Sequence, residues 1–431
     1  MYFSLDVLPA HKGDCLMLHY GSESDRHLML IDGGPADVYK PQLKPRIKRV
    51  HASRQLDETD ALPVDVVMVS HIDDDHIRGL LELTKEQRGK SPDLRLRVRS
   101  LWHNSFDEIL SGEAQEAVPA SGAASVLAGL DQGPAAFGGE LEDGNEETHQ
   151  AIELLSSIPQ GRQLREDAEA LRWGINRQFK GRLISATEAS KPVTLDGGLK
   201  VTVAGPMQRE LSSLRQAHEK WLREHAKGRR KTPEAMLAAF VDKSVPNLSS
   251  IVVLAELGGK TMLLTGDARG DRILEGLKLA RVLKPGGKLH VNILKVPHHG
   301  SSNNMETGFF RRVTADHYVF SGDGQHGNPR RETLEMLLEA RGHDDDYAIH
   351  LTYPLKTIDT AREADWNKEQ AKEKKRFKKN PVSKNKPRSN WSPAKHSLAA
   401  LLKIHPELKK KLRIVKGEHL HLIDLLDPVK L

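Results

Sequence analysis

The sequence predicts an α/β protein in which two β-sheets lie between layers of helices. Short apolar runs typical of strands come in two groups, within residues 3–102 and 199–353, and helical patterns follow strands in both groups. Several of these runs end in Gly, Asp or His, as loops at strand ends do. Consecutive groups of strands, each closed by a helix, are typical of two sheets packed between helices.

The first group of strands occupies about the first hundred residues. Alternating or continuous apolar runs predict strands at Phe3–Val7, Cys15–Tyr20, His27–Gly34, Asp65–Val69 and Arg95–Trp102, and helices at Gln42–His51 and Ile77–Glu86. Cys15 is the only cysteine, so the sequence excludes an internal disulfide and a cysteine-based zinc site. Within its apolar alternation, Cys15 is expected to be a small buried hydrophobic residue.

The composition changes after residue 105, which suggests an insertion between two halves of one core. Residues 106–194 are predicted to be mainly helical, with helices at Glu147–Leu155 and Leu164–Phe179. The domain boundaries expected are therefore 1–105, 106–194, 195–358 and a C-terminal extension at 359–431. The second half has predicted strands at Leu199–Ala204, Ser250–Leu257, Lys260–Leu264, His290–Val296, His317–Ser321 and Ala348–Tyr353, with helices at Gln208–Lys227, Asp271–Leu279 and Arg331–Ala340. In the extension, a helix is expected at Pro393–Lys403 and an apolar stretch at Leu420–Leu426.

Composition and charge limit the location and the partners of the chain. No apolar run approaches the length of a membrane span, and the N-terminus lacks the basic start and apolar core of a signal peptide. The prediction is a cytoplasmic protein without a membrane segment, which could form a homo-oligomer or bind a partner protein. The net charge is +6. Residues 366–386 contain eight Lys and one Arg against two Glu, enough to account for that surplus.

The basic segment has two interpretations of equal weight. It could bind the phosphate backbone of nucleic acid, through Lys374, Lys375 and Arg376 and with Trp366, Phe377 and Trp391 as stacking partners. Alternatively, it could be a solvated helix face followed by a linker.

A cluster of His and Asp after a predicted strand indicates a metal site. His71, Asp73, Asp75 and His76 lie within six positions, directly after the apolar run 66–69. Such groups would repel and desolvate each other if they were buried without a cation. Three later strand ends carry further candidate ligands: Asp267, the pair His298 and His299, and His326 in a glycine-rich loop. Loops at the ends of strands can bring such residues to one point.

Six motifs in order resemble the metallo-β-lactamase superfamily, and most closely the hydrolase domain of ComEC-like competence proteins. They are Gly13–Leu16, Leu30–Gly34, Ser70–His76, Asn247–Ile251, Leu263–Asp267 and Leu294–Ser301. The resemblance spans roughly residues 3–340. It implies an αββα sandwich with a two-metal site at one rim.

The resemblance also implies a role for each motif residue. His71 and Asp73 would help to hold one divalent ion, and Asp75 and His76 the other, while Asp267 would bridge them. His298 or His299 would complete the second ion. Alternation along a strand indicates that only one of the two is a direct ligand, and His298 is preferred. Asp14 and Asp32 would orient ligands.

Two departures from the family pattern bear on the metal. Asp73 stands where the family commonly has His, and a carboxylate there favours Mn²⁺ or Mg²⁺ over Zn²⁺. Gly205-Pro206 follows the strand after which the family often has a further His, so His103 or a water would have to serve. The expected cofactors are two divalent ions, Zn or Mn.

The function expected from these residues is hydrolysis of phosphodiesters by a two-metal enzyme, most simply a nuclease acting on DNA. Asp75 could orient the attacking water, His326 could protonate the leaving group, and Ser301 and Ser302 could donate hydrogen bonds to a phosphate. Two alternatives stay open. One is hydrolysis of a small phosphoester, a cyclic nucleotide or a lactone, with the insertion as a lid. The other is a catalytically weak member that binds nucleic acid or protein.

Overall fold

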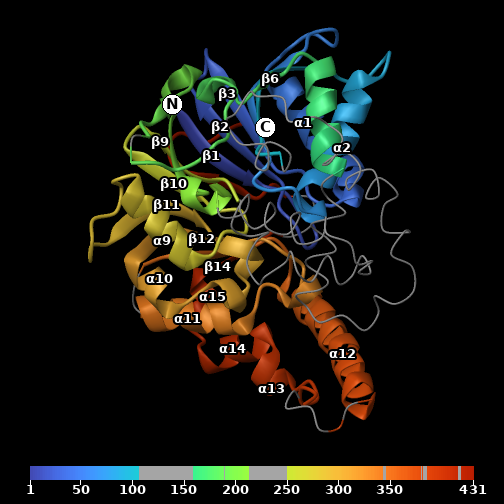
Figure 1. The fold of residues 1–431 in the computed structure, drawn as a ribbon, viewed down its shortest axis with the longest axis vertical. Helices are drawn as coiled ribbons and strands as arrows, with labels where there is room; N and C mark the ends of the chain where they lie inside the picture. The colour runs from blue at the N-terminus through green and yellow to red at the C-terminus, as the bar shows by residue number, and fades with distance from the viewer. Residues whose placement is uncertain are drawn as a thin grey trace, which may run out of the picture.

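The structure is a computed structural model that describes residues 1–105, 159–188, 190–212, 250–342, 346–379, 381, 386–415 and 419–431. In these ranges the chain forms two mixed β-sheets of seven and eight strands, with helices around them (Figure 1). The predicted α/β class with two sheets is therefore confirmed. The predicted helix Glu147–Leu155 and most of Gln208–Lys227 lie outside the described residues.

The first sheet is antiparallel in one half and parallel in the other. Its order is β15 (Leu422–Asp424), β1 (Tyr2–Val7), β2 (Leu16–Gly21), β3 (Arg26–Ile31), β4 (Leu62–Met68), β5 (Leu96–Trp102) and β6 (Gly174–Ile175). The strands from β3 to β6 run parallel to one another. Their carboxyl ends therefore meet at one edge of the sheet, and the start of β2 reaches the same edge because Leu16 pairs with Ile31.

The second sheet is likewise antiparallel in one part and parallel in the other. Its order is β14 (Leu412–Ile414), β13 (Ala348–Leu351), β12 (Val313–Phe320), β11 (Leu289–Lys295), β10 (Lys260–Leu264), β9 (Val252–Leu257), β8 (Lys200–Gly205) and β7 (Val193–Thr194). The strands from β10 to β14 are parallel, and those from β7 to β10 are antiparallel. The loops after β10, β11 and β12 therefore leave one edge together.

Alternation along the strands gives each sheet two buried faces. In β3, Met29 and Ile31 join a core that contains residues of both sheets, whereas Leu28 and Leu30 pack toward α1 (Lys44–Ser53) and α2 (Asp74–Arg88). The other face of the second sheet packs against α9 (Gly270–Leu279), α10 (Thr307–Arg312), α11 (Arg331–Arg341) and α14 (Leu398–Ile404). The two sheets thus lie between two layers of helices. Cys15 is buried, as predicted.

The described part of the predicted insertion is less helical than expected. Residues 159–170 form a helix, but the predicted helix Leu164–Phe179 was too long, because the chain turns and adds β6 beside β5. The strand signal was missed because β6 has only two residues.

The segment expected as an extension takes part in both sheets. β14 pairs with β13 and β15 pairs with β1. Between β13 and β14 lie α12 (Leu355–Lys379), α13 (Pro393–His396), α14 and α15 (Leu408–Lys411). Among the described residues, no helix has the length and apolar character needed to cross a bilayer.

Candidate metal centre

The loop from β4 to α2 positions four candidate ligands. β4 ends at Met68 and α2 begins at Asp74, so His71 and Asp73 lie in the loop and Asp75 and His76 in the first helical turn. Asp32, which follows β3, holds this loop in place. Its carboxylate accepts hydrogen bonds from the backbone N–H of Ser70 (2.7 Å) and the Ser70 hydroxyl (2.7 Å), and it lies 2.8 Å from Nδ1 of His76.

The contact with Asp32 orients the His76 ring. A carboxylate beside Nδ1 favours a proton on that nitrogen and leaves Nε2 as the ligand atom. His76 is fully buried, and its Nε2 faces Asp267. This is the orienting role that the resemblance implied for Asp32, and the geometry is consistent with it.

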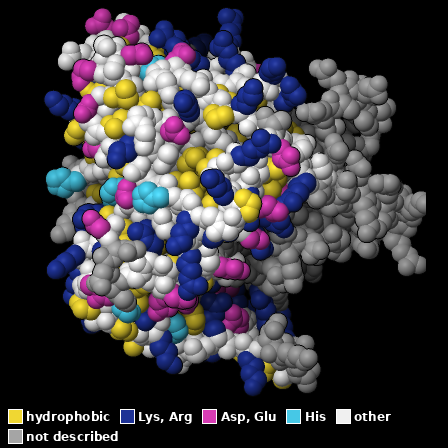
Figure 2. All heavy atoms as spheres, turned by 90° about the vertical axis from the view of Figure 1, so that its left-hand side faces the viewer, with side chains coloured by type: hydrophobic (Ala, Val, Ile, Leu, Met, Phe, Trp, Pro, Cys, Tyr) yellow, Lys and Arg dark blue, Asp and Glu magenta, His cyan; other side chains and the backbone are white. Residues whose placement is uncertain are grey.

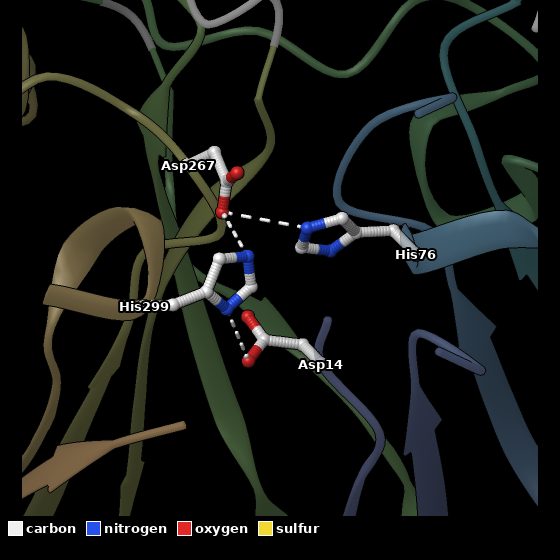
Figure 3. A group of neighbouring side chains, drawn as sticks. All are labelled: Asp14, His76, Asp267 and His299. Atoms are coloured by element: carbon white, nitrogen blue, oxygen red, sulfur yellow. Dashed lines mark ion pairs between the residues drawn. The ribbon is translucent and has the colours of Figure 1, made fainter. Parts of the chain in front are cut away.

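Asp267 stands at the centre of the cluster, in the turn after β10. Its Oδ1 atom lies 3.4 Å from Nε2 of His76 and 3.4 Å from Nε2 of His299 (Figure 3). Its Oδ2 atom lies 3.6 Å from Nε2 of His71 and 3.6 Å from Nε2 of His298. Each oxygen of one carboxylate therefore faces a separate pair of imidazoles.

Two further carboxylates lie beside these imidazoles. Oδ2 of Asp73 lies 3.4 Å from Nε2 of His71. The oxygens of Asp75 lie 3.9 Å from Nε2 of His76 and 3.7 Å from Nε2 of His299. Two groups of potential ligand atoms occur, and within each group all the atoms lie within 4.8 Å of one another. One group comes from Asp14, His76, Asp267 and His299, and the other from His71, Asp75 and His76. These buried groups could hold a metal ion.

The spacing of these atoms fits a cation between them. Two ligands that each lie about 2.0–2.2 Å from a tetrahedral ion are about 3.3–3.6 Å apart, and the contacts of Asp267 with the four imidazoles are 3.4–3.6 Å. The Nε2 atoms of His71, His76 and His299 are buried and have no hydrogen-bond partner among the described residues. Buried polar atoms are normally satisfied, and coordination of a metal would satisfy all three.

The structure places Nε2 of both His298 and His299 within 3.6 Å of Asp267, and of the two only His299 belongs to a group of potential ligand atoms among the described residues. That only one of the pair is a metal ligand stays a prediction, but the reason given for it was wrong. That prediction used the alternation of a strand, but β11 ends at Lys295 and the pair lies in the turn Pro297–Gly300. Both residues have positive φ, 48° and 53°, so their side chains do not alternate. His299 is the more buried of the two: its side chain is 2% exposed, whereas the side chain of His298 is 20% exposed.

A buried ion pair lies beside Nδ1 of His299, the ring nitrogen that faces away from Asp267. The Nδ1 atom of His299 lies 3.4 Å from Oδ1 of Asp14 and 3.0 Å from the Ser321 hydroxyl. The other oxygen of Asp14 pairs with the ammonium of Lys295, and both side chains are almost inaccessible to water. Asp14 thus contacts His299, and it also belongs to a group of potential ligand atoms; its predicted orienting role stays a prediction. Lys295 was not predicted.

The electrostatics of the cluster favour cations. Burial alone would lower the pKa of His299, but Asp267 and Asp14 raise it to about 9. Burial is likewise outweighed at His76, where Asp267, Asp32 and Asp75 raise the pKa well above its usual value. In Asp267, burial is outweighed by the four imidazoles, which lower the pKa well below its usual range. The carboxylates that stabilise these protons would stabilise a divalent cation in their place.

His326 lies beside the cluster and not in it. Its Nε2 atom is 3.4 Å from the Lys12 ammonium. Partial removal from water and the charge of Lys12 lower the pKa of His326 to about 4. The imidazole is therefore neutral near pH 7, which does not suit the predicted general acid. A phosphate bound beside it would raise this pKa again.

The remaining predicted residues differ in their surroundings. His103 is buried after β5 and belongs to neither ligand group; burial and Arg165 lower its pKa to about 4. The backbone N–H of Ser301 donates to the carbonyl of His298 at 2.8 Å, so it is not available to a phosphate. Ser302 is half-buried.

In the basic helix α12, the predicted binding residues are not equivalent. Lys374 and Lys375 are both exposed, although Lys374 also donates to Oε1 of Gln370 at 2.8 Å, and Arg376 is half-buried. The rings of Trp366 and Trp391 pack against each other, 5.8 Å between centroids. Base stacking on these rings, considered from the sequence, would require that packing to open.

Comparisons with known proteins give only short matches. No family model matches the chain. Microtubule-associated protein futsch of Drosophila melanogaster is 36% identical over 77 residues, and microtubule-associated protein 1A of Homo sapiens is 40% identical over 57 residues. These matches cover 18% and 13% of this chain but 1% and 2% of those proteins. Matches of this extent transfer no activity.

Proposed function

We propose that this protein is a metal-dependent hydrolase of phosphodiesters, with a metallo-β-lactamase-like αββα sandwich and DNA as the substrate. The single observation that carries the proposal is the position of Asp267, whose two oxygens each face a separate pair of imidazoles at 3.4–3.6 Å. A carboxylate in this position suits a bridge between two cations.

The contacts support a division of the candidate ligands between two cations. His71, Asp73 and His298 would hold the first cation, and Asp75, His76 and His299 the second, with Asp267 shared. His298 would then stand in for the histidine that the family has after the strand ending at Gly205. Imidazoles with carboxylates suit Zn²⁺ or Mn²⁺, and the carboxylate of Asp73 favours Mn²⁺. When bound, such a pair of ions supplies a nucleophile from water near neutral pH and neutralises charge on a phosphodiester.

Residues of the chain would position the substrate. Asp75 is half-buried, so a bound water could reach its carboxylate from solvent. Lys12 and His326 face each other at 3.4 Å beside Asp75. An ammonium can only donate, so Lys12 donates to Nε2 of His326, and its positive charge beside Asp75 suits a phosphate oxygen. This feature favours a phosphodiester over a neutral ester or lactone.

The proposal is tested by metal analysis and hydrolysis on the same preparations. The protein would be stripped of metal, reloaded with Mn²⁺ or Zn²⁺, and assayed with DNA and with bis(p-nitrophenyl) phosphate. Asp75→Ala/His76→Ala should lose both metal and hydrolysis. A matched control is His290→Ala/Asp316→Ala, which removes an exposed His–Asp pair of 3.1 Å on β11 and β12 and should retain both.

The outcomes separate the proposal from its rivals. Equal hydrolysis by the double variant at the cluster would defeat the proposal. Hydrolysis of small esters with no activity on DNA would favour a small-molecule substrate. A folded protein that binds no metal, yet still binds nucleic acid or protein, would favour a non-catalytic function.

A further inference from the structure

The helix α12 is anchored beside the candidate metal centre. Its first half packs against the loop that carries His326, where Nε of Arg362 donates to the carbonyl of Gly327 at 3.1 Å. Arg362 also donates to the carbonyl of His396 at 2.7 Å, and Asp359 accepts from the backbone N–H groups of Leu398 and Ala399 at the start of α14. Arg362 is buried. The helix is therefore held firmly at this end, and its other end projects from the body of the protein (Figure 1).

One face of α12 is covered by the chain that returns along it. Trp366 donates from Nε1 to the carbonyl of Ser389, and Gln370 donates to the carbonyl of Arg388. Glu373 accepts from the backbone N–H and from Nε of Arg388, both at 2.8 Å. Trp366, Gln370 and Glu373 are spaced i, i+4, i+7, so they share one face of the helix.

The opposite face carries a row of lysines, Lys368, Lys372, Lys375 and Lys379. They are spaced i, i+4, i+7, i+11, and the first three follow the residues of the covered face by two positions. Two positions correspond to a rotation of about 200°, which places this lysine row on the far side of the helix. Lys368, Lys375 and Lys379 are exposed, and Lys372 contacts Glu369 at 2.8 Å.

The lysine row begins near the metal centre and leads away from it. Lys368 is close enough to His326 for its charge to act on the imidazole. From Lys368 to Lys379 the helix rises about 16 Å, at 1.5 Å per residue. That length matches about five nucleotides of a stacked strand at 3.4 Å each. A cyclic nucleotide or a lactone is too small to span it.

We infer that α12 is a binding surface for a nucleic-acid strand, which the lysine row holds as the strand leaves the metal centre. The inference rests on the proposed function, because a phosphodiester in the centre continues into further phosphates on both sides. Lys and Arg on the face of the molecule in Figure 2 are mixed with acidic and hydrophobic side chains. The lysine row differs in that its four cations share one helix face.

The test is the double charge reversal Lys375→Glu/Lys379→Glu, at the end of α12 far from the metal ligands. Binding of a labelled single-stranded DNA of about 20 nucleotides would be measured by fluorescence anisotropy with EDTA present, between about 50 and 200 mM salt. Loss of two phosphate contacts should reduce the slope of log K against log salt by about 1.4 and weaken binding about 25-fold near 0.1 M salt. The matched control is Lys409→Glu/Lys410→Glu, two exposed lysines on α15, which should bind DNA as the unchanged protein does.

The outcomes distinguish this inference from the proposed function. Unchanged affinity and salt slope in Lys375→Glu/Lys379→Glu would overturn the inference. Equal competition by polyglutamate or by anionic vesicles would also overturn it, because the surface would then not select nucleic acid. Hydrolysis of bis(p-nitrophenyl) phosphate reports on the metal centre alone, since this substrate is too short to reach α12. If the unchanged protein does not hydrolyse bis(p-nitrophenyl) phosphate but binds DNA, and Lys375→Glu/Lys379→Glu loses that binding, the inference is supported while the proposed function fails.

Discussion

Replacing Lys295 with Met should destabilise the protein strongly. Lys295 and Asp14 form an ion pair in which both side chains are about 98–99% removed from water. The substitution keeps most of the volume but leaves the Asp14 carboxylate buried without its ammonium. Removing one partner of a buried pair typically costs about 3–5 kcal/mol, which is a large part of a total stability of about 5–15 kcal/mol.

The assay is urea unfolding of the metal-free protein at neutral pH, followed by circular dichroism. Lys200→Met, at an exposed position on β8, is the control and should change stability by less than about 0.5 kcal/mol. Asp14→Asn/Lys295→Met should recover part of the loss, since neither charge is left alone. The reasoning would be refuted if Lys295→Met lost less than about 1 kcal/mol of unfolding free energy. It would also be refuted if the double variant lost the full sum of the losses in Asp14→Asn and Lys295→Met.

Three further changes test other parts of the structure. Asp267→Asn should reduce affinity at both of the proposed metal positions by more than the roughly 10–100-fold seen for residues that only orient ligands, and titration calorimetry would contradict a shared role if one position kept full affinity. Burial, opposed by Asp6, lowers the pKa of His421 to about 4. The unfolded chain therefore binds the proton first, so this imidazole should contribute a fall in stability of about 3 kcal/mol between about pH 6.5 and pH 4; urea unfolding of His421→Phe should show a fall over that range that is smaller by this amount, because the other buried histidines remain. Gly79→Ala would place a Cβ 1.9 Å from the carbonyl oxygen of Gly33 and should cost about 1–3 kcal/mol despite its higher helix propensity, as thermal unfolding can check.

The gathering of the site could be predicted because its residues follow parallel strands. The runs that became β4, β10 and β11 each end in side chains of the ligand type, and parallel pairing brings the ends of β10 and β11 to one edge of the second sheet. Because β4 belongs to the first sheet, the convergence of Asp267 with His71 and His76 also needed the two sheets to pack against each other. The motif resemblance added which carboxylate would be shared.

The parts that were missed depend on backbone conformation or on distant pairing. The positive φ of His298 and His299 has no signal in residue type, because neither is glycine. The burial of Lys295 could have been predicted, because Lys295 lies on the same face of β11 as Val291 and Ile293, and all three are buried. The strand β14 has three residues, too few for a periodic pattern.

The pairing of β1 with β15 has a consequence during synthesis. The partners Ser4 and Asp424 are 420 residues apart. At about 5–20 residues per second, a ribosome needs roughly 20–80 seconds to make that stretch. For that time the apolar β1 has an unpaired edge, which invites pairing with other nascent chains. Yield of folded protein should therefore depend on chaperones and on slow, dilute expression.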